Sequence, residues 1–181
     1  RQMTTVDADN VHNVAVDGTF DDCQDLVKAM FADVAFRDEV RLSAVNSINW
    51  ARVMAQIVYY VVASSRVASV STPVSFTVPT GNFGNVLAGW IAKQMGADIE
   101  KLIVGSNSND ILTRFFETHC MDMVPVVPTL SPSMDIQVSS NFERLLFDMN
   151  NRDGGATTEQ LNRFRQTGKL SVGPDQFAKW I

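Results

Sequence analysis

The run Val74–Met95 constrains the fold of this chain more than any other segment. It begins with a β-branched apolar stretch, continues with the turn Thr80-Gly-Asn-Phe-Gly-Asn85, and ends in an amphipathic pattern of helical period. A strand, a tight turn and a helix in this order leave unpaired backbone N–H groups at the start of the helix, and these groups favour an anion above the turn. Gly81 and Gly84 lack the Cβ atoms that would keep a phosphate away, and we expect them to supply permissive backbone angles as well. The sequence therefore predicts an anion cradle over Thr80–Asn85.

This turn differs from the two commonest phosphate motifs. Walker A requires Lys and then Ser or Thr after its second glycine, whereas Asn85 follows Gly84 here. The dinucleotide fingerprint requires three glycines. The sequence thus implies a different phosphate-bearing cofactor, although a purely structural glycine turn would also fit these residues.

Composition limits the kinds of protein that the chain can form. With 181 residues and 45% hydrophobic residues, it can build one sizeable core or parts of two domains. A net charge of −5 argues against nucleic acid as a partner. Cys23 and Cys120 lack metal-type or disulfide-type spacing, which predicts a reducing, cytoplasmic setting. The apolar run Val53–Ala63 is shorter than the roughly 20 residues that a membrane helix needs, so no membrane segment is predicted.

Three segments show the same order of strand, turn and helix. Strands are expected at Val11–Val16, at Val74–Val78 and at Lys101–Val104, and each is followed by a polar turn and an amphipathic stretch. This recurrence predicts an α/β fold with a parallel sheet and helices on both faces. Ligands of such sheets bind where strands end and helices begin, so the turns after Val78 and Val104 are expected to form the walls of a site.

Polar residues mark the starts of three further helices. A long helix is expected from about Ser47 to Ser65. Ser140 with Glu143 forms a capping box before the next helix, and Thr157 repeats the pattern before the last one.

A second candidate anion site lies at the start of the long helix. Asn46 or Ser47 would cap this helix, its first N–H groups would face an anion, and Arg52 would reach back as a clamp. Capping alone would explain Asn46 and Ser47 equally well, so the residues themselves leave both interpretations open.

Metal and nucleophile chemistry find little support in the sequence. His12 and His119 lie far apart and neither has a second histidine at ligand spacing, so no metal site is predicted. Ser131 and Ser133 lack the glycines of a nucleophile elbow.

Four runs of the sequence resemble the threonine synthases, and Asp17–Asp22 is similar too. The resemblance covers nearly everything before about residue 150. The four runs are Ala44–Arg52, Val78–Asn85, Asn107–Phe115 and Thr129–Arg144.

The resemblance implies a pyridoxal-phosphate enzyme of the second fold type, similar to the tryptophan synthase β subunit. Members of this family convert O-phosphohomoserine and water into threonine and inorganic phosphate. The implied organisation places the end of one α/β lobe at residues 1–45 and the cofactor-phosphate-binding part of the other at 46–150. Residues 151–181 would form a truncated helical tail.

The resemblance also implies roles for the two candidate sites. The residues implied to hold the cofactor phosphate are Thr80, Gly81, Asn82, Phe83, Gly84 and Asn85. The residues implied to bind the anionic groups of the substrate are Asn46, Ser47 and Arg52, with Asn82 facing the reaction space.

The chain departs from the family at the lysine that bonds the cofactor. In the family this lysine precedes an aspartate in an upstream motif, and none of the five lysines here precedes Asp. These five are Lys28, Lys93, Lys101, Lys169 and Lys179. We therefore expect an internal fragment without a catalytic residue of its own, which is inactive in isolation.

Two other functions remain open at this stage. One is a non-catalytic module of the same α/β fold that binds a phosphate ligand or has a regulatory role. The other is a different lyase of the second fold type, such as threonine dehydratase, although the run Asn46–Asn49 suits a phosphorylated substrate better. The sequence does not decide the oligomeric state.

Overall fold

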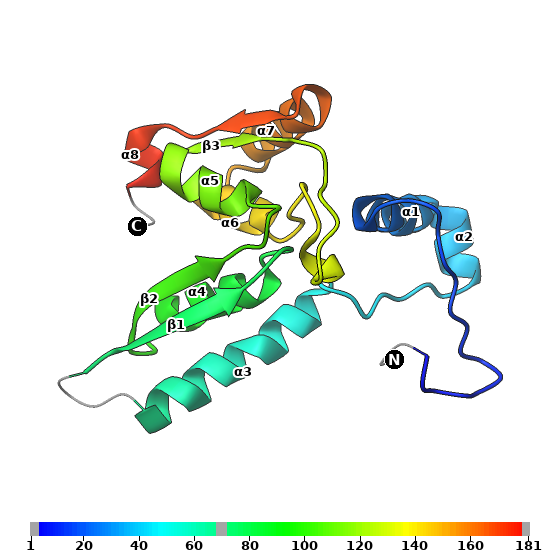
Figure 1. The fold of residues 1–181 in the computed structure, drawn as a ribbon, viewed down its shortest axis with the longest axis horizontal. Helices are drawn as coiled ribbons and strands as arrows, with labels where there is room; N and C mark the ends of the chain where they lie inside the picture. Colours follow the sequence, from blue (N-terminus) through cyan, green and yellow to red (C-terminus); the bar gives the residue numbers. More distant parts are fainter. Residues whose placement is uncertain (1–3, 68–71, 179–181) are drawn as a thin grey trace. The chain divides into compact units, whose positions relative to one another are not determined.

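The computed structural model describes residues 4–67 and 72–178. The chain divides into two compact units, Arg1–Leu42 and Ser43–Ile181. The first unit contains α1 (Phe20–Ala32) and α2 (Val34–Glu39). The second contains α3 (Trp50–Val67), β1 (Val74–Pro79), α4 (Gly84–Gln94), β2 (Ile99–Gly105), α5 (Ile111–Thr118), β3 (Cys120–Asp122), η1 (Pro132–Met134), α6 (Phe142–Met149), α7 (Gly154–Thr167), β4 (Lys169–Ser171) and α8 (Pro174–Phe177) (Figure 1).

A capping box starts the first helix of the first unit. The Thr19 hydroxyl accepts from the Asp22 N–H at 3.3 Å, and the Asp22 carboxylate accepts from the Thr19 N–H at 2.6 Å. The strand predicted at Val11–Val16 is wrong, because this segment has no strand pairing and Val14 is 83% exposed. A strand is stable only when it pairs with a neighbour, and alternating valines do not provide one.

The parallel pair of β1 and β2 is the centre of the second unit. Phe76 lies opposite Leu102, Val78 opposite Val104, and both strands end at the same edge (Figure 1). The crossover between them is α4, as the βα pattern predicted. The α/β class with a parallel sheet is thus confirmed.

Helices α3 and α4 pack on one face of this pair. The Tyr60 ring of α3 lies 4.8 Å from the Phe76 ring, measured between centroids. Gly89 of α4 approaches both Tyr60 and Leu102 so closely that a Cβ atom there would lie 2.7 Å and 2.9 Å from them. Side chains on the opposite face, such as Thr77, are exposed.

An aromatic cluster extends the core toward the C-terminal part of the chain. Phe115 of α5 lies 4.8 Å from Phe142 of α6 and 5.5 Å from Phe177 of α8, all in edge-to-face geometry. The antiparallel pair of β3 and β4 joins Met121 to Leu170 beside it. The segment predicted as a helical tail thus contains α7, β4 and α8, while the assignment of lobes to residues 1–45, 46–150 and 151–181 stays a prediction.

Two of the predicted helix caps are wrong. Asn141, not Ser140, precedes α6, and it makes no side-chain capping bond. Asp153 caps α7 by accepting from the Ala156 N–H at 3.0 Å, so the helix starts before Thr157. Ser140 and Thr157 are instead buried and bonded elsewhere.

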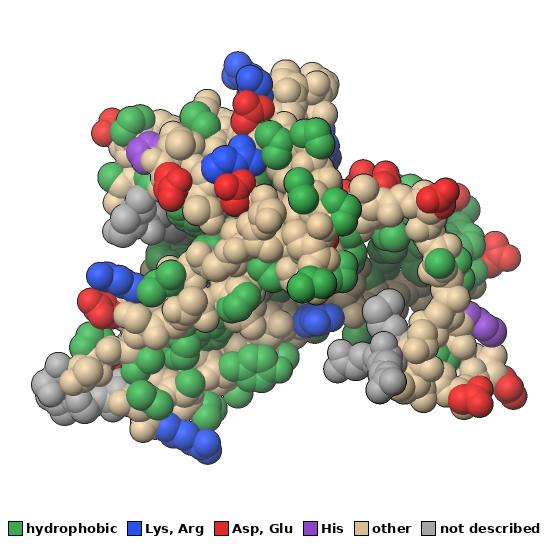
Figure 2. Space-filling view, viewed as in Figure 1, with side chains coloured by type: hydrophobic (Ala, Val, Ile, Leu, Met, Phe, Trp, Pro, Cys, Tyr) green, Lys and Arg blue, Asp and Glu red, His purple; other side chains and the backbone are tan. Residues whose placement is uncertain are grey.

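Helix α3 carries an exposed apolar stripe. Figure 2 shows apolar side chains gathered over this helix, and Met54, Val58 and Tyr59 are each more than half exposed. Across residues 4–67 and 72–178, the structure contains no helix with the length and hydropathy required to cross a bilayer.

Candidate functional site

The glycine turn is held by its own hydrogen bonds. The Thr80 N–H donates to the Gly105 carbonyl at 3.0 Å, which continues the ladder of β1 and β2. The Thr80 hydroxyl then accepts from the Phe83 N–H at 3.1 Å. These two bonds fold the chain back at the carboxyl edge of the sheet, where α4 begins.

The left-handed residue of the turn is Phe83, with φ of 61°, and neither Gly81 nor Gly84 has a positive φ. The expectation that these glycines supply unusual backbone angles is therefore wrong. Phe83 tolerates this conformation because the residue is 2% exposed and its ring packs against Phe142 at a centroid distance of 5.8 Å. The aromatic core thus stabilises the turn.

The glycines are required for space. A Cβ atom on Gly81 would lie 3.0 Å from the Met134 Cα and 3.2 Å from the Ser133 carbonyl oxygen. A Cβ atom on Gly84 would lie 3.1 Å from the Asn141 side-chain nitrogen. The loop from 133 to 141 therefore lies directly against the turn.

The start of α4 presents backbone donors as the sequence predicted. The Leu87 N–H makes the bond of the first helical turn, to the Phe83 carbonyl at 2.9 Å. The N–H groups of Gly84, Asn85 and Val86 precede it, where no earlier helical turn offers acceptors. This end of the helix also carries the positive end of the helix dipole.

The buried residues 139–141 form hydrogen bonds to the glycine turn. The Ser139 hydroxyl donates to the Gly81 carbonyl at 2.8 Å, and the Ser140 hydroxyl donates to the Asn82 side-chain oxygen at 3.2 Å. The Asn141 N–H donates to the Asn82 carbonyl at 3.1 Å. These bonds fix both the backbone and the side-chain amide of Asn82.

The second candidate site begins one turn before α3. The Asn46 side chain accepts from the Ile48 N–H at 3.2 Å, and the Asn49 side chain accepts from the Ala51 N–H at 2.9 Å. The cap predicted at Asn46 or Ser47 is therefore wrong, because these side-chain bonds delay the helix until Trp50. Loop 46–49 precedes the helix.

Arg52 folds back over this loop. Its guanidinium donates to the Val45 carbonyl at 3.4 Å, and the side chain is exposed. The side chain thus folds back toward loop 46–49, while its role as an anion clamp stays a prediction.

Asn141 brings the two candidate sites together. Its side-chain nitrogen donates to the Ser47 carbonyl at 2.7 Å, while its backbone N–H binds Asn82. A Cβ atom on Gly84 would lie 3.8 Å from the same Ser47 oxygen. Loop 46–49 and the glycine turn are therefore neighbours across one fully buried side chain.

Arg144 secures the same junction. Its guanidinium donates to the Asn141 side-chain oxygen and, at 2.7 Å, to the Ile48 carbonyl. It also lies 5.7 Å from the centre of the Trp50 ring, within cation–π range. Burial lowers the pKa of Arg144, while the neighbouring Glu143 carboxylate acts in the opposite direction.

Four residues of this arrangement were not predicted as site residues from the sequence: Ser139, Ser140, Asn141 and Arg144. The signal was present, since all four fall in the run Thr129–Arg144 that carried the family resemblance. Their partners lie up to 96 positions away in the chain, so no local pattern pointed to them.

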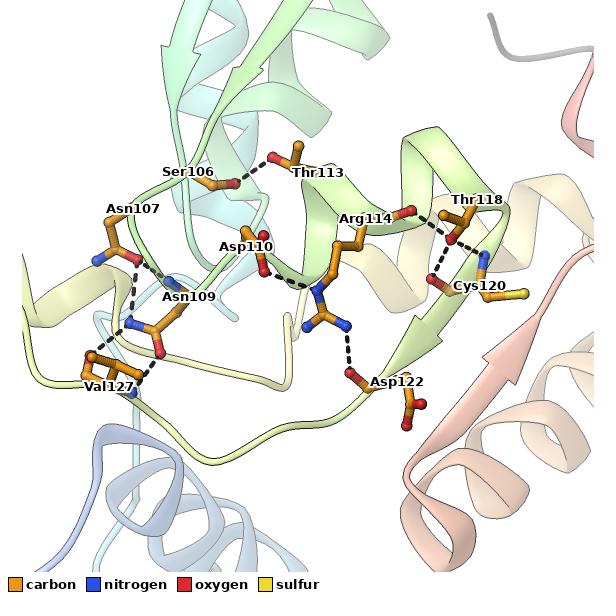
Figure 3. Close-up of polar contacts among 10 residues, drawn as sticks. All are labelled: Ser106, Asn107, Asn109, Asp110, Thr113, Arg114, Thr118, Cys120, Asp122 and Val127. Carbon is orange, nitrogen blue, oxygen red and sulfur yellow. Dashed lines mark hydrogen bonds and ion pairs between the residues drawn. The ribbon is translucent and has the colours of Figure 1, made fainter.

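The side chains of the polar turn after β2 form hydrogen bonds within the protein. Figure 3 shows the Asn109 amide donating to the Val127 carbonyl at 2.8 Å and accepting from the Val127 N–H at 2.9 Å. Asn107 and Asn109 both donate to the Asp135 carboxylate, at 2.7 Å and 3.1 Å. The amide groups expected to line a wall of the site therefore join two loops.

Asp135 is the centre of that polar network. The Thr129 hydroxyl and N–H donate to its two carboxylate oxygens at 2.6 Å and 2.8 Å. The Thr129 hydroxyl bond is the largest cause that lowers the pKa of Asp135, and desolvation of this 8% exposed residue partly opposes it. Met134 and Ile136 flank Asp135 and lie next to Gly81. The hydrogen bonds of Asp135 therefore stabilise the segment that packs against the glycine turn.

Tyr60 links α3 to the far side of the same turn. Its hydroxyl donates to the Asn85 side-chain oxygen at 2.5 Å. Burial raises the pKa of Tyr60 to about 12. Asn85, one of the residues implied to hold the cofactor phosphate, is thus oriented by a neutral phenol.

The two histidines are found in different units of the chain. His119 ends α5 in a left-handed conformation and stacks on Phe177 at a centroid distance of 3.9 Å, whereas His12 is exposed. Within the described parts of the chain, no three His, Cys, Asp or Glu side chains gather closely enough to hold a metal ion.

The similar proteins named below are all threonine synthases. No known family profile matches the sequence. The threonine synthase of Pseudomonas aeruginosa is 56% identical over 172 residues, which cover 95% of this chain and 37% of that enzyme. The crystal structure of pyridoxal-phosphate-bound threonine synthase from Brucella melitensis matches 98% of this chain with a TM-score of 0.84 and 49% identity. Yeast threonine synthase matches the same share with a TM-score of 0.79 and 42% identity.

The matches to these solved structures cover 38% and 37% of their chains. The chain thus spans a little over a third of the length of its relatives. By sequence and by fold, the chain belongs to the threonine synthase family.

Proposed function

We propose that the chain supplies the cofactor-phosphate cradle and part of the substrate-anion site of a threonine synthase. The cofactor would be pyridoxal 5'-phosphate, and the substrate O-phospho-L-homoserine, which reacts with water to give threonine and phosphate. The single observation that carries the proposal is the bridge of Asn141 between Ser47 and Asn82, which joins two anion-binding loops. The match to a structure with bound pyridoxal phosphate supports the identity of the cofactor.

The glycine turn fits a phosphate group. Gly84, Asn85 and Val86 offer backbone N–H donors at the positive end of α4. The Thr80 hydroxyl accepts from Phe83 and keeps its own proton to donate. Gly81 and Gly84 can hold this shape only without side chains, as the close approach of Met134 and Asn141 requires. In this proposal Phe83 contributes through its backbone and packing.

Loop 46–49 and Arg52 would bind the phosphate of the substrate. Asn46 and Ser47 lie in the loop, and the exposed Arg52 guanidinium folds over it. Asn82, held by Ser140, would face the space between this loop and the cofactor. Donors of this kind stabilise the negative charge that builds on a leaving phosphate.

The cofactor, when bound, supplies an electron sink for the reaction, and the residues of this chain bind and orient the two phosphate groups. We propose that the isolated chain is inactive, since no lysine here stands in the family context. The Lys93 amine, for example, donates to the Glu100 carbonyl at 2.6 Å and lies at the C-terminal end of α4.

Mass spectrometry tests directly whether any lysine of the chain bonds the cofactor. After incubation with pyridoxal phosphate and reduction with borohydride, the expected result is no dominant adduct at any one lysine. A stoichiometric adduct on one lysine would overturn the inactivity proposal.

The proposed location of the protein is the cytoplasm. The free thiols of Cys23 and Cys120 support a reducing cytoplasm. The partner we propose is the small phosphorylated substrate, with neither nucleic acid nor a membrane.

Calorimetry with substrate tests the proposed function. O-Phosphohomoserine should bind the chain more tightly than homoserine, because only the former carries the phosphate. Arg52→Met should weaken binding about tenfold, the loss expected for one charge-assisted contact. Arg66→Met, at the exposed far end of α3, is the matched control and should leave binding unchanged.

Three results would contradict the proposal. These are no binding of the phosphorylated ligand, equal binding of both ligands, or preferential binding of threonine, which would favour the dehydratase alternative.

A further inference from the structure

Arg144 lies at the junction of the two anion-binding loops and belongs to neither. It extends from the first turn of α6 and donates to the Asn141 side chain and to the Ile48 carbonyl. Asn141 in turn binds Ser47 and Asn82. A single guanidinium thus holds loop 46–49 directly and the glycine turn through one buried amide.

The charge of Arg144 has no acidic partner within ion-pair distance among the residues that the structure describes. The neighbouring Glu143 instead binds Arg165 at 3.3 Å. The two oxygens that Arg144 contacts are a neutral amide and a neutral carbonyl, and its third neighbour is the Trp50 ring.

A half-buried guanidinium without a counterion is unfavourable in the absence of an anion. Arginine does not lose its proton in proteins, so burial cannot be relieved by neutralisation. An anion bound at loop 46–49 would supply the missing negative charge. Its binding would also favour the arrangement of Asn141 that positions the glycine turn.

We propose that Arg144 is a positioning residue that couples the substrate-anion loop to the cofactor-phosphate turn, so that occupation of one strengthens binding at the other. This inference rests on the proposed function and adds a regulatory link within the same site. Thermodynamic linkage requires the effect to be reciprocal between the two loops.

Amide NMR of the chain, titrated with inorganic phosphate, tests the coupling. In the wild type, the Ser47 signal of the first loop and the Gly84 signal of the second should shift together with one apparent Kd. Arg144→Met should raise that Kd about tenfold, the loss expected for charge-assisted bonds. Arg66→Met, at the opposite end of α3 and about 24 Å along the helix from Trp50, removes the same charge and should leave both signals unchanged.

Arg144→Lys separates the effect of the positive charge from the effect of the planar guanidinium. It also provides a test if the Arg144→Met variant does not fold. Lysine keeps the charge but is not a planar fork that can hold two acceptors at once. The expected result is phosphate binding in which Ser47 and Gly84 report two different Kd values. A rescued single Kd would show that charge alone suffices, and would overturn the positioning role.

The outcomes separate this inference from the proposed function. No response to phosphate at either loop in the wild type would overturn the proposed function and, with it, the coupling. A joint response in the wild type that persists unchanged in both Arg144 variants would overturn the coupling alone.

Discussion

The Asn141 side chain donates to the Ser47 carbonyl at 2.7 Å, although the two residues are 94 positions apart in the chain. Asn141 is completely buried and also holds Asn82 through its backbone. One residue outside both candidate loops therefore determines how they lie against each other. The same contact makes the starts of α3 and α4 neighbours in one candidate site.

Removal of the Asn141 side chain should destabilise the fold. Asn141→Ala leaves the half-buried Ser47 carbonyl without its donor and removes one of the two oxygen acceptors of the Arg144 guanidinium. We expect a loss of about 2–3 kcal/mol in the free energy of unfolding. Urea denaturation measures this loss, and Asn162→Ala on the exposed face of α7 should change stability by less than about 0.5 kcal/mol. Equal effects of the two substitutions would contradict the structural role of Asn141.

A methyl group at Gly84 should disturb both loops. Gly84→Ala places a Cβ atom 3.1 Å from the Asn141 side-chain nitrogen, so the amide that donates to Ser47 must shift by a few tenths of an ångström. We expect a loss of about 1–3 kcal/mol and a shift of the Ser47 amide signal. Gly154→Ala is the matched control, because nothing lies within 4 Å of the added methyl group and helix propensity favours alanine. Wild-type stability and an unmoved Ser47 signal in Gly84→Ala would contradict the close packing of Gly84 against the Asn141 side chain.

Gly89 tests the packing of α3 on α4. A Cβ atom there would lie 2.7 Å from the Tyr60 ring and 2.9 Å from Leu102, both parts of the core beneath the sheet. Gly89→Ala should therefore cost about 1–3 kcal/mol despite its better helix propensity. It should also alter the Asn85 amide signal, because Tyr60 binds that residue. Thermal unfolding and NMR check the two parts, and a more stable variant would contradict this packing.

The loss of folding stability at acid pH, called here the acid limb, should depend on Asp135. Hydrogen bonds from Thr129, Asn107 and Asn109 lower its pKa in the folded chain below the ordinary value of about 3.9. Its contribution is therefore fully present above that ordinary value and is lost as the pH falls through the lowered folded pKa. Denaturant midpoints from pH 6 down to about 2 should fall less steeply for Asp135→Asn than for the wild type.

The control for Asp135 removes an exposed carboxylate of the other unit. Asp9→Asn, at an exposed position of the first unit, should leave the acid limb unchanged. Parallel curves for Asp135→Asn and the wild type would indicate that other carboxylates dominate the acid limb.

Local features of the fold could be predicted from sequence, and long-range contacts could not. The strand before Thr80, the helix after Gly84 and the strand ending near Val104 each depend on periodicity within a short window, and the structure contains all three. The run Val11–Val16 has the same local signal but forms no strand. A strand depends on its partner, which periodicity does not reveal.

The site shows the same limit. The glycine turn and loop 46–49 were predicted from their residue types, and the structure places them side by side. The left-handed residue was expected at a glycine but is Phe83, because the buried aromatic cluster outweighs the backbone preference. Asn141 and Arg144 act through partners more than 90 positions away, so only the fold reveals them.

The central claim is that the start of α4 binds the phosphate of pyridoxal phosphate beside loop 46–49. Amide NMR with pyridoxal 5'-phosphate and, as the matched control, pyridoxal without phosphate tests it most directly. The amide signals of Gly81, Gly84 and Asn85 should shift with the phosphorylated compound and stay unmoved with pyridoxal. Equal shifts with both compounds, or shifts confined to other parts of the chain, would contradict it.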